Sequence, residues 1–400
     1  MRKRVPPGVS LLSWATGVRW FGWGLFEALL PVFLFSFAHT YAETGLLSSI
    51  YNIAFMLSWP LAGMLADRVA SKTIIVAGLL LYPFISISYF LAGVSGFALF
   101  IVIARVLNGV GYAFDSVGRD TYFRAHTPPK SIASAFGYSN TVTHFCWIGA
   151  VLLSMLIVPF VPLHWLFLAI IPTVIITIFM VLRLLPDHTE KFKDGLRKAV
   201  SGGVYIGLLR EMRSWSTGLQ LSAVLTFFTG FIATLAEFFI PIYAYVQGAS
   251  LPQVIFISVI LNIPQLFGTW LGRIADRNHV KSLLAGLGCV CLLLAVLTFS
   301  QGYLWQLVVV FGIGIVLELI DLAGDGITTH LAHPRHYGRI SGAMEGLGDL
   351  GSVAGPVVLG LLLDKAGMAF TVWSLAGVVL VLGIVVYAAR ASFGAVAAKQ

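Results

Sequence analysis

The chain has 400 residues, of which 58% are hydrophobic and only 10% are charged. Soluble globular domains carry about a quarter charged residues, so this composition excludes an ordinary soluble protein. The formal net charge is +8, but the basic residues are spread between apolar runs and form no single patch, so we expect no nucleic-acid partner.

Apolar runs long enough to cross a bilayer recur from one end of the chain to the other. A helix needs about 20 mostly apolar residues to cross a hydrocarbon core about 30 Å thick. Membrane spans are either helices or strands of a closed barrel, and these runs lack the strict alternation of barrel strands. We predict an all-α polytopic membrane protein with about twelve spans, near residues 9–37, 44–64, 73–93, 97–118, 134–158, 164–185, 216–246, 252–272, 282–300, 305–328, 339–363 and 369–391.

The basic residues predict the orientation of these spans. With the N-terminus inside, all but three of the 25 Lys and Arg residues fall in cytoplasmic segments or at their edges. The exceptions are Arg19 and Arg105 within spans and Lys365 on the outer side. This positive-inside bias predicts that both termini are cytoplasmic, and the multi-pass chain suits a plasma membrane such as the bacterial inner membrane. The apolar run to Phe37 is too long for a signal peptide, so we interpret it as the first span.

Charged side chains inside the first-half spans are candidate functional residues. A charge at this depth is costly unless it is paired or hydrated, which marks it for a role in a pathway or a binding site. Arg105 and Asp115 both fall in the fourth span, and Arg119 follows Asp115 at an i,i+4 spacing. If Asp115 and Arg119 form an ion pair, their role would be structural. If Asp115 is not paired with Arg119, its carboxylate could take part in binding a substrate or a proton.

The longest polar stretch, residues 186–215, divides the chain almost in half. It is rich in Lys and Arg and contains Ser201-Gly202-Gly203, which predicts a cytoplasmic linker. Residues 208–213 are either an amphipathic helix at the membrane surface or part of a flexible linker. We therefore predict an N-terminal six-helix bundle over residues 1–185 and a C-terminal six-helix bundle over residues 216–400.

Carboxylates are concentrated in the predicted spans ten and eleven. Glu318, Asp321 and Asp325 are offset by three and seven residues, so they lie on one face of a helix. Asp349 follows Glu345 at a helical i,i+4 spacing in span eleven. Such carboxylates repel one another unless protons, a metal cation or a cationic solute neutralise them. We predict no metal site, but Glu318 and Asp321 would be the ligands if one existed. Alternatively, Asp325 and Glu345 could pair with Arg335 and Arg339, near the cytoplasmic ends of the spans.

Three landmarks of the first half recur in the second half, in the same order and offset by 205 to 210 residues. This predicts a six-helix unit duplicated in parallel. One landmark is a glutamate four residues before a proline, present as Glu27 and Glu237. Each carboxyl could bind and release a proton, oppose a cationic solute, or anchor a helix that is disrupted at the following proline. The other landmarks are residues 63–72 with 272–281, and Asp120, Pro129 and Gly137 with Asp325, Pro334 and Gly342.

These motifs resemble those of the major facilitator superfamily. The loop Gly63-x-Leu-Ala-Asp-Arg-x-x-x-Lys72 is similar to the family's signature loop, with Ala70 and Ser71 in place of a glycine and an arginine. Arg105-x-x-Asn-Gly-x-Gly111 resembles a second family motif, and Pro334 to Gly342 resembles a later cytoplasmic turn. The resemblance implies two bundles that alternate access to a central cavity. It also implies a role for Arg105 in binding substrate or coupling protons.

The resemblance further implies a cytoplasmic gate made of ion pairs. Its residues would be Asp67, Arg68 and Lys72 together with their copies Asp276, Arg277 and Lys281. Setting the topology is an alternative role for the basic members, but that role does not explain a recurrent aspartate. Certain antiporters of the family carry a Gly-Pro kink in span five, where this chain has Gly149-Ala150, and this disfavours drug/proton antiport.

We predict a secondary transporter that moves a small organic solute by alternating access with proton coupling. We see no P-loop, nucleophile elbow or HExxH motif, so we expect no enzymatic activity and no cofactor. The expected partners are the solute, protons and the lipid bilayer, and we expect a monomer. Two alternatives remain: a cation or metal exporter that uses the acidic second half, and a non-transporting membrane sensor on a transporter fold.

Overall fold

The structure is a computed structural model, and it describes residues 6–66, 68–127, 132–184, 215–299, 302–331 and 337–393. Within these ranges, nine helices are long and apolar enough to cross a membrane, and Leu251–Phe267 is a shorter apolar helix. This confirms the prediction of an all-α polytopic membrane protein. The predicted linker lies outside the described residues, apart from Trp215.

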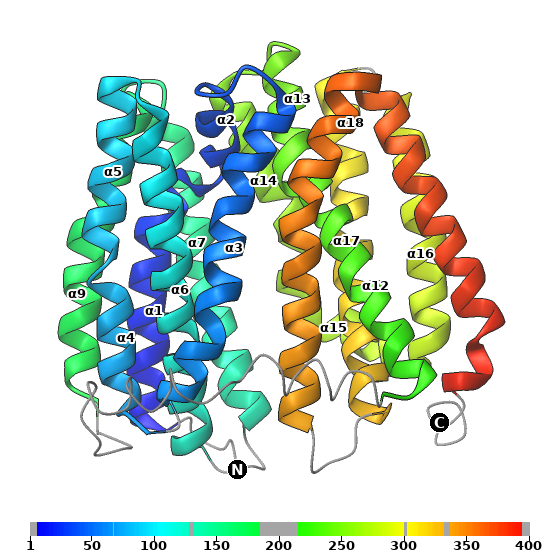
Figure 1. Ribbon diagram of the computed structural model, residues 1–400, viewed down its shortest axis with the longest axis horizontal. Helices are drawn as coiled ribbons and strands as arrows, with labels where there is room; N and C mark the ends of the chain where they lie inside the picture. The colour runs from blue at the N-terminus through cyan, green and yellow to red at the C-terminus, as the bar shows by residue number, and fades with distance from the viewer. Residues whose placement is uncertain are drawn as a thin grey trace. The chain divides into compact units, whose positions relative to one another are not determined.

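The chain divides into two compact units. The first comprises residues 1–37 and 50–204, and the second comprises residues 38–49 and 205–400. Helix α3 (Tyr41–Ala66) therefore begins in the second unit and continues in the first. The other helices of the first unit are α1 (Pro7–Glu27), α2 (Leu30–Phe35), α4 (Ser71–Leu79), α5 (Tyr82–Ser95), α6 (Ala98–His126), α7 (Ile132–Ile157), α8 (Leu163–Leu166) and α9 (Ile170–Leu182) (Figure 1).

The second unit contains the remaining helices, and its last one covers two predicted spans. Helix α18 kinks at Gly367, whose φ of 76° falls in the left-handed region that glycine adopts readily. The kink separates the predicted spans 339–363 and 369–391. The helices of this unit are α12 (Thr217–Thr234), α13 (Ile240–Val246), α14 (Leu251–Asn262), α15 (Gly268–Ala275), α16 (His279–Thr298), α17 (Tyr303–Leu331) and α18 (Tyr337–Ala388).

Proline explains where several spans break into two helices. A proline inside a helix has no N–H to donate, and its ring clashes with the carbonyl four residues earlier. Helix α1 ends at Glu27, four residues before Pro31, and α4 ends at Leu79, four residues before Pro83. With such broken helices counted as one span each, the helices are consistent with the predicted twelve spans.

The same effect shapes the backbone at Glu237. Residues Leu235–Phe239 form a π-turn between α12 and α13, closed by a hydrogen bond from the Ile240 N–H to the Leu235 carbonyl. Pro241 follows four residues after Glu237, at the centre of this turn. Single π-turns are uncommon and occur often at functional sites. Glu27 and Glu237 therefore each lie at a proline-induced break in a helix.

Helix packing repeats between the two units. In the first unit α1 packs against α7, and α6 packs against α4 and α5. In the second unit α12 packs against the first part of α18, and α17 packs against α16. The paired helices occupy the same order along each half of the chain. This agreement supports the duplication that the sequence landmarks predict.

Candidate polar sites in the two units

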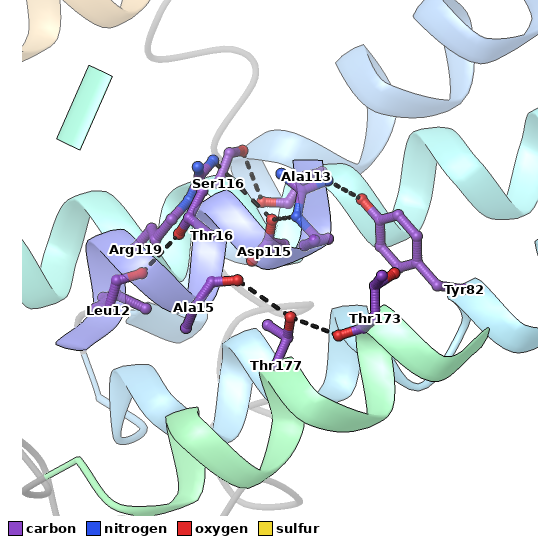
Figure 2. Close-up of polar contacts among 11 residues, drawn as sticks. Leu12, Ala15, Thr16, Tyr82, Ala113, Asp115, Ser116, Arg119, Thr173 and Thr177 are labelled. Carbon is purple, nitrogen blue, oxygen red and sulfur yellow. Dashed lines mark hydrogen bonds and ion pairs between the residues drawn. The ribbon is translucent and has the colours of Figure 1, made fainter. Parts of the chain in front are cut away.

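A buried ion network joins α1 and α6 in the first unit. The Arg19 Nε lies 3.1 Å from the Asp115 Oδ2, and the side chains are only 2% and 4% exposed. The Arg119 Nη2 lies 4.0 Å from the same oxygen (Figure 2). The predicted i,i+4 pair of Asp115 and Arg119 is thus present, but Arg19 is the closer partner. Two guanidinium groups share one carboxylate.

Aromatic side chains surround the Arg19 guanidinium. Its Nη1 donates a hydrogen bond of 3.0 Å to the Tyr82 hydroxyl. Its central carbon lies 5.1 to 5.7 Å from the ring centroids of Trp20, Tyr82 and Tyr112. Cation–π contacts of this kind strengthen when water is excluded. The sequence singled out Arg19 only as a basic residue inside a span. Its pairing depends on how α1 is rotated against α6, and no spacing encodes that rotation.

Arg105 is also buried in the first unit, at 5% exposure. Its guanidinium carbon lies 4.9 Å from the centroid of the Tyr51 ring. The Tyr51 ring in turn contacts the rings of Phe55 and Tyr112, with centroids 6.2 and 6.3 Å away. Tyr112 also contacts Arg19. Arg19 and Arg105 therefore both lie next to the same group of aromatic rings. This arrangement offers both positive charge and aromatic faces.

Glu27 accepts a hydrogen bond from the Trp147 indole of α7. The Glu27 side chain is half-buried at the end of its helix. The three predicted alternatives for Glu27 remain compatible with this position, because an indole can anchor the carboxylate without preventing it from binding a proton or opposing a cation.

The second unit contains four carboxylates that interact electrostatically. Asp325, Glu318 and Glu237 all interact electrostatically with Asp321, although Glu237 comes from the π-turn and the others from α17. Glu237, Asp321 and Asp325 are exposed, and Glu318 is half-buried. Gly268 of α15 leaves room for Glu318, since a Cβ there would lie 2.8 Å from the Glu318 Oε1. We call Glu237, Glu318, Asp321 and Asp325 the acidic group.

The sequence predicted the stripe on span ten but did not predict that Glu237 would join it. Asp349 is half-buried on a different helix, α18. Within the described part of the chain, no three His, Cys, Asp or Glu residues are arranged to hold a metal ion. The predicted pairing of Asp325 with Arg335 cannot be placed, since Arg335 lies outside the described residues.

The predicted gate residues that the structure describes lie just before or within the first turn of α4, and around the turn between α15 and α16. Asp67 itself lies outside the described residues, and Arg68 is exposed beside it. The Lys72 Nζ donates a hydrogen bond of 3.1 Å to the Leu184 carbonyl, just beyond the end of α9. A cation there complements the negative end of the helix dipole. In the second unit Asp276, Arg277 and Lys281 are exposed around the turn between α15 and α16. Their role in a gate stays a prediction.

Comparison with known proteins places the fold in a family. A sequence model of the Major Facilitator Superfamily matches residues 12–356, with a second match over 270–395. The chain belongs to the major facilitator superfamily. The nucleoside transporter NupG has the same fold, with a TM-score of 0.74 over 96% of this chain and 99% of NupG, at 15% identity.

Curated relatives match only part of their own length. The quinolone resistance protein NorA of Staphylococcus aureus is 30% identical over 121 residues, which is 30% of this chain and 30% of NorA. The putative multidrug resistance protein MdtD of Yersinia pestis is 28% identical over 232 residues, which is 53% of this chain and 48% of MdtD. The family and these relatives identify a multi-pass membrane protein of a transporter family.

Proposed function

We propose that this protein is a secondary active transporter that moves a small organic solute by alternating access and couples that movement to protons. The observation that carries the proposal is the acidic group, in which three carboxylates from two elements interact electrostatically with Asp321. Interacting carboxylates repel one another when all are ionised. Adding a proton or a cationic group relieves that repulsion, so the acidic group can bind either one in exchange for the other.

The first unit supports an aromatic solute. Arg105 and Arg19 adjoin the rings of Tyr51 and Tyr112, which offer stacking surfaces beside a positive charge. The relatives are described as quinolone and multidrug resistance proteins, which extends the same proposal to drug-like solutes. An amphiphilic or zwitterionic aromatic solute would suit a basic first unit and an acidic second unit.

A proteoliposome assay with a fluorescent quinolone as the probe tests the proposal. We expect a pH gradient to drive accumulation of the probe by the intact protein, because inward and outward faces then differ in how many acidic-group carboxylates are protonated. Asp321→Asn removes the residue on which the other three carboxylates act and should abolish pH-driven accumulation, while exchange of labelled for unlabelled probe continues. Asp187→Asn, in the predicted linker, is the control and should behave as the unsubstituted protein.

Each alternative function has its own outcome in this assay. A metal exporter would accumulate Mn²⁺ under the same gradient and ignore the quinolone. A sensor would bind the probe without any flux. Equal pH-driven accumulation by Asp321→Asn and the unsubstituted protein would remove the acidic group from the coupling mechanism.

The proposal includes the location and orientation predicted from charge. We place the protein in the bacterial inner membrane with both termini in the cytoplasm, acting as a monomer. The positive-inside distribution of Lys and Arg supports this orientation. In this orientation Lys365, between the predicted spans 339–363 and 369–391, lies on the outer side of the membrane.

A further inference from the structure

The start of helix α3 is capped partly by its own residues. The first N–H groups of a helix have no carbonyl partner within the helix. The Glu43 N–H donates to the Thr40 Oγ1 at 3.1 Å, and the Glu43 Oε2 accepts from the His39 N–H at 2.7 Å. Thr40 is thus the N-cap residue of α3, and the Glu43 carboxylate reaches back to the residue that precedes it, His39. These contacts leave the N–H groups of Tyr41 and Ala42 to be satisfied by another group.

Asp364 of α18 satisfies both of them. The Tyr41 N–H donates to the Asp364 Oδ1, and the Ala42 N–H donates to the Asp364 Oδ2, each at 2.8 Å. The partners are 323 and 322 residues apart in the sequence. A carboxylate at this place also complements the positive end of the helix dipole. The cap of α3 is therefore completed by a residue from a distant helix.

Small residues continue this contact along both helices. The Ser49 Oγ donates a hydrogen bond of 2.6 Å to the Val353 carbonyl. A Cβ added at Gly45 would lie 2.0 Å from the Pro356 carbonyl oxygen, and one added at Gly360 would lie 2.5 Å from the Tyr41 carbonyl oxygen. Only glycine permits so close an approach of two backbones, which is a common way for membrane helices to associate.

These contacts all lie within the second unit, because residues 38–49 belong to it. We call residues 38–49 the detachable segment of α3. The chain passes into the first unit at Ile50 with no break in the helix. One helix is thus shared by both units. Its first turns contact α18 and, through the Tyr41 ring, Phe239 of the second unit.

The cap is built so that it can open at low cost. The Asp364 side chain and the contacts it accepts are exposed. When such a contact breaks, water can satisfy both the carboxylate and the two N–H groups, so no buried polar group is left unpaired. Release of the segment must also separate the Tyr41 ring from the Phe239 ring, whose centroids are 6.2 Å apart, and the Ser49 hydroxyl from the Val353 carbonyl.

We propose that Asp364 is a releasable cap that holds the detachable segment on α18, and that this segment leaves α18 at one stage of the transport cycle. This inference rests on the proposed function, since it assigns the release to alternating access. In the proposed orientation the cap acts on the outer side of the membrane. The segment would then be held in one access state and free in the other.

Hydrogen–deuterium exchange of the purified full chain tests the holding step without any ligand. We expect amide exchange in a peptide covering residues 39–48 to rise about fivefold or more in Asp364→Ala, since loss of a helix cap is typically worth that much. Gly360→Ala acts by a different route, because its Cβ would push the Tyr41 backbone away, and it should raise exchange in the same peptide. Lys365→Gln, at the exposed neighbour of Asp364, is the control and should leave exchange unchanged.

Transport of the fluorescent quinolone in proteoliposomes tests the release step. We expect Asp364→Ala to change the rate of probe exchange at equal probe concentration, because the capped state is no longer favoured. Unchanged deuterium exchange in both Asp364→Ala and Gly360→Ala would overturn the cap. Faster deuterium exchange with an unaltered transport rate would overturn its part in the cycle. If the unsubstituted protein transports nothing, the proposed function fails and the release step fails with it, while deuterium exchange still decides the holding step.

Discussion

At the residue scale, the network of Arg19, Asp115 and Arg119 ties α1 to α6 inside a membrane bundle. Burying a charge pair is costly, and it is tolerated where the geometry is good and further hydrogen bonds are made. Here the Arg19 Nη1 bonds Tyr82, but its Nη2 and the Arg119 Nε lack a hydrogen-bond partner in the described structure. Asp115 is the carboxylate that pairs with both guanidinium groups.

Asp115→Asn should destabilise the protein by about 3–5 kcal/mol, because removing one partner leaves uncompensated buried charge. The measurement is thermal unfolding in detergent, read as a lower melting temperature. Arg119→Gln is the comparison variant, since its guanidinium is more exposed and lies 4.0 Å from the carboxylate. We expect a much smaller drop there. Equal melting temperatures for Asp115→Asn and the unsubstituted protein would show that the network contributes nothing to stability.

Sequence reasoning at this scale succeeded where the partners are close along one helix. The Asp115–Arg119 pair follows from a spacing of four, and the structure contains it. The pairing of Arg19 with Asp115 and the approach of Glu237 to Asp321 were not predicted. Both depend on how two separate helices are rotated and placed, and periodicity within one helix carries no such information.

At the element scale, length and hydropathy predicted the spans. Disruption at the prolines that follow Glu27 and Glu237 was one of the predicted alternatives, and a helix breaks at each. Neither the N-cap at Thr40 nor the completion of that cap by Asp364 was predicted. The sequence also did not predict how closely α12 packs against α18. Gly351 of α18 faces the backbone of α12, where an added Cβ would lie 2.1 Å from the Phe227 carbonyl oxygen.

Gly351→Ala should therefore separate α12 from α18 and destabilise the second unit by about 1–3 kcal/mol, as overpacking of a close contact does. Gly377→Ala is the matched control, on the same helix α18, because nothing lies within 4 Å of its added Cβ. There the gain in helix propensity should leave stability unchanged or raise it by up to about 1 kcal/mol. Melting temperatures of the two variants in the same detergent make the comparison. A Gly351→Ala protein as stable as Gly377→Ala would mean that the two helices do not approach this closely.

At the scale of the whole molecule, the duplicated units have kept their architecture and diverged in their chemistry. Both retain a glutamate four residues before a proline, at a break in the helix. Glu27 accepts a hydrogen bond from Trp147 and is half-buried, whereas Glu237 is exposed and interacts with Asp321. The sequence repeat alone predicted equal roles for the two. The surroundings supplied by the neighbouring helices make the positions unequal.

The final prediction follows from that inequality. Glu237→Gln removes a titratable carboxyl from the acidic group and should abolish pH-driven accumulation of the quinolone probe, while exchange of labelled for unlabelled probe continues. Glu27→Gln keeps an oxygen that can still accept from the Trp147 indole, so we expect it to retain pH-driven accumulation with little change in melting temperature. The two variants are each other's control, since they make the same substitution at equivalent positions. Loss of coupling in Glu27→Gln alone would reverse the assignment and make the first unit the site of proton coupling. Retained coupling in both would leave Glu318 and Asp321 as the carboxyls that carry the proton.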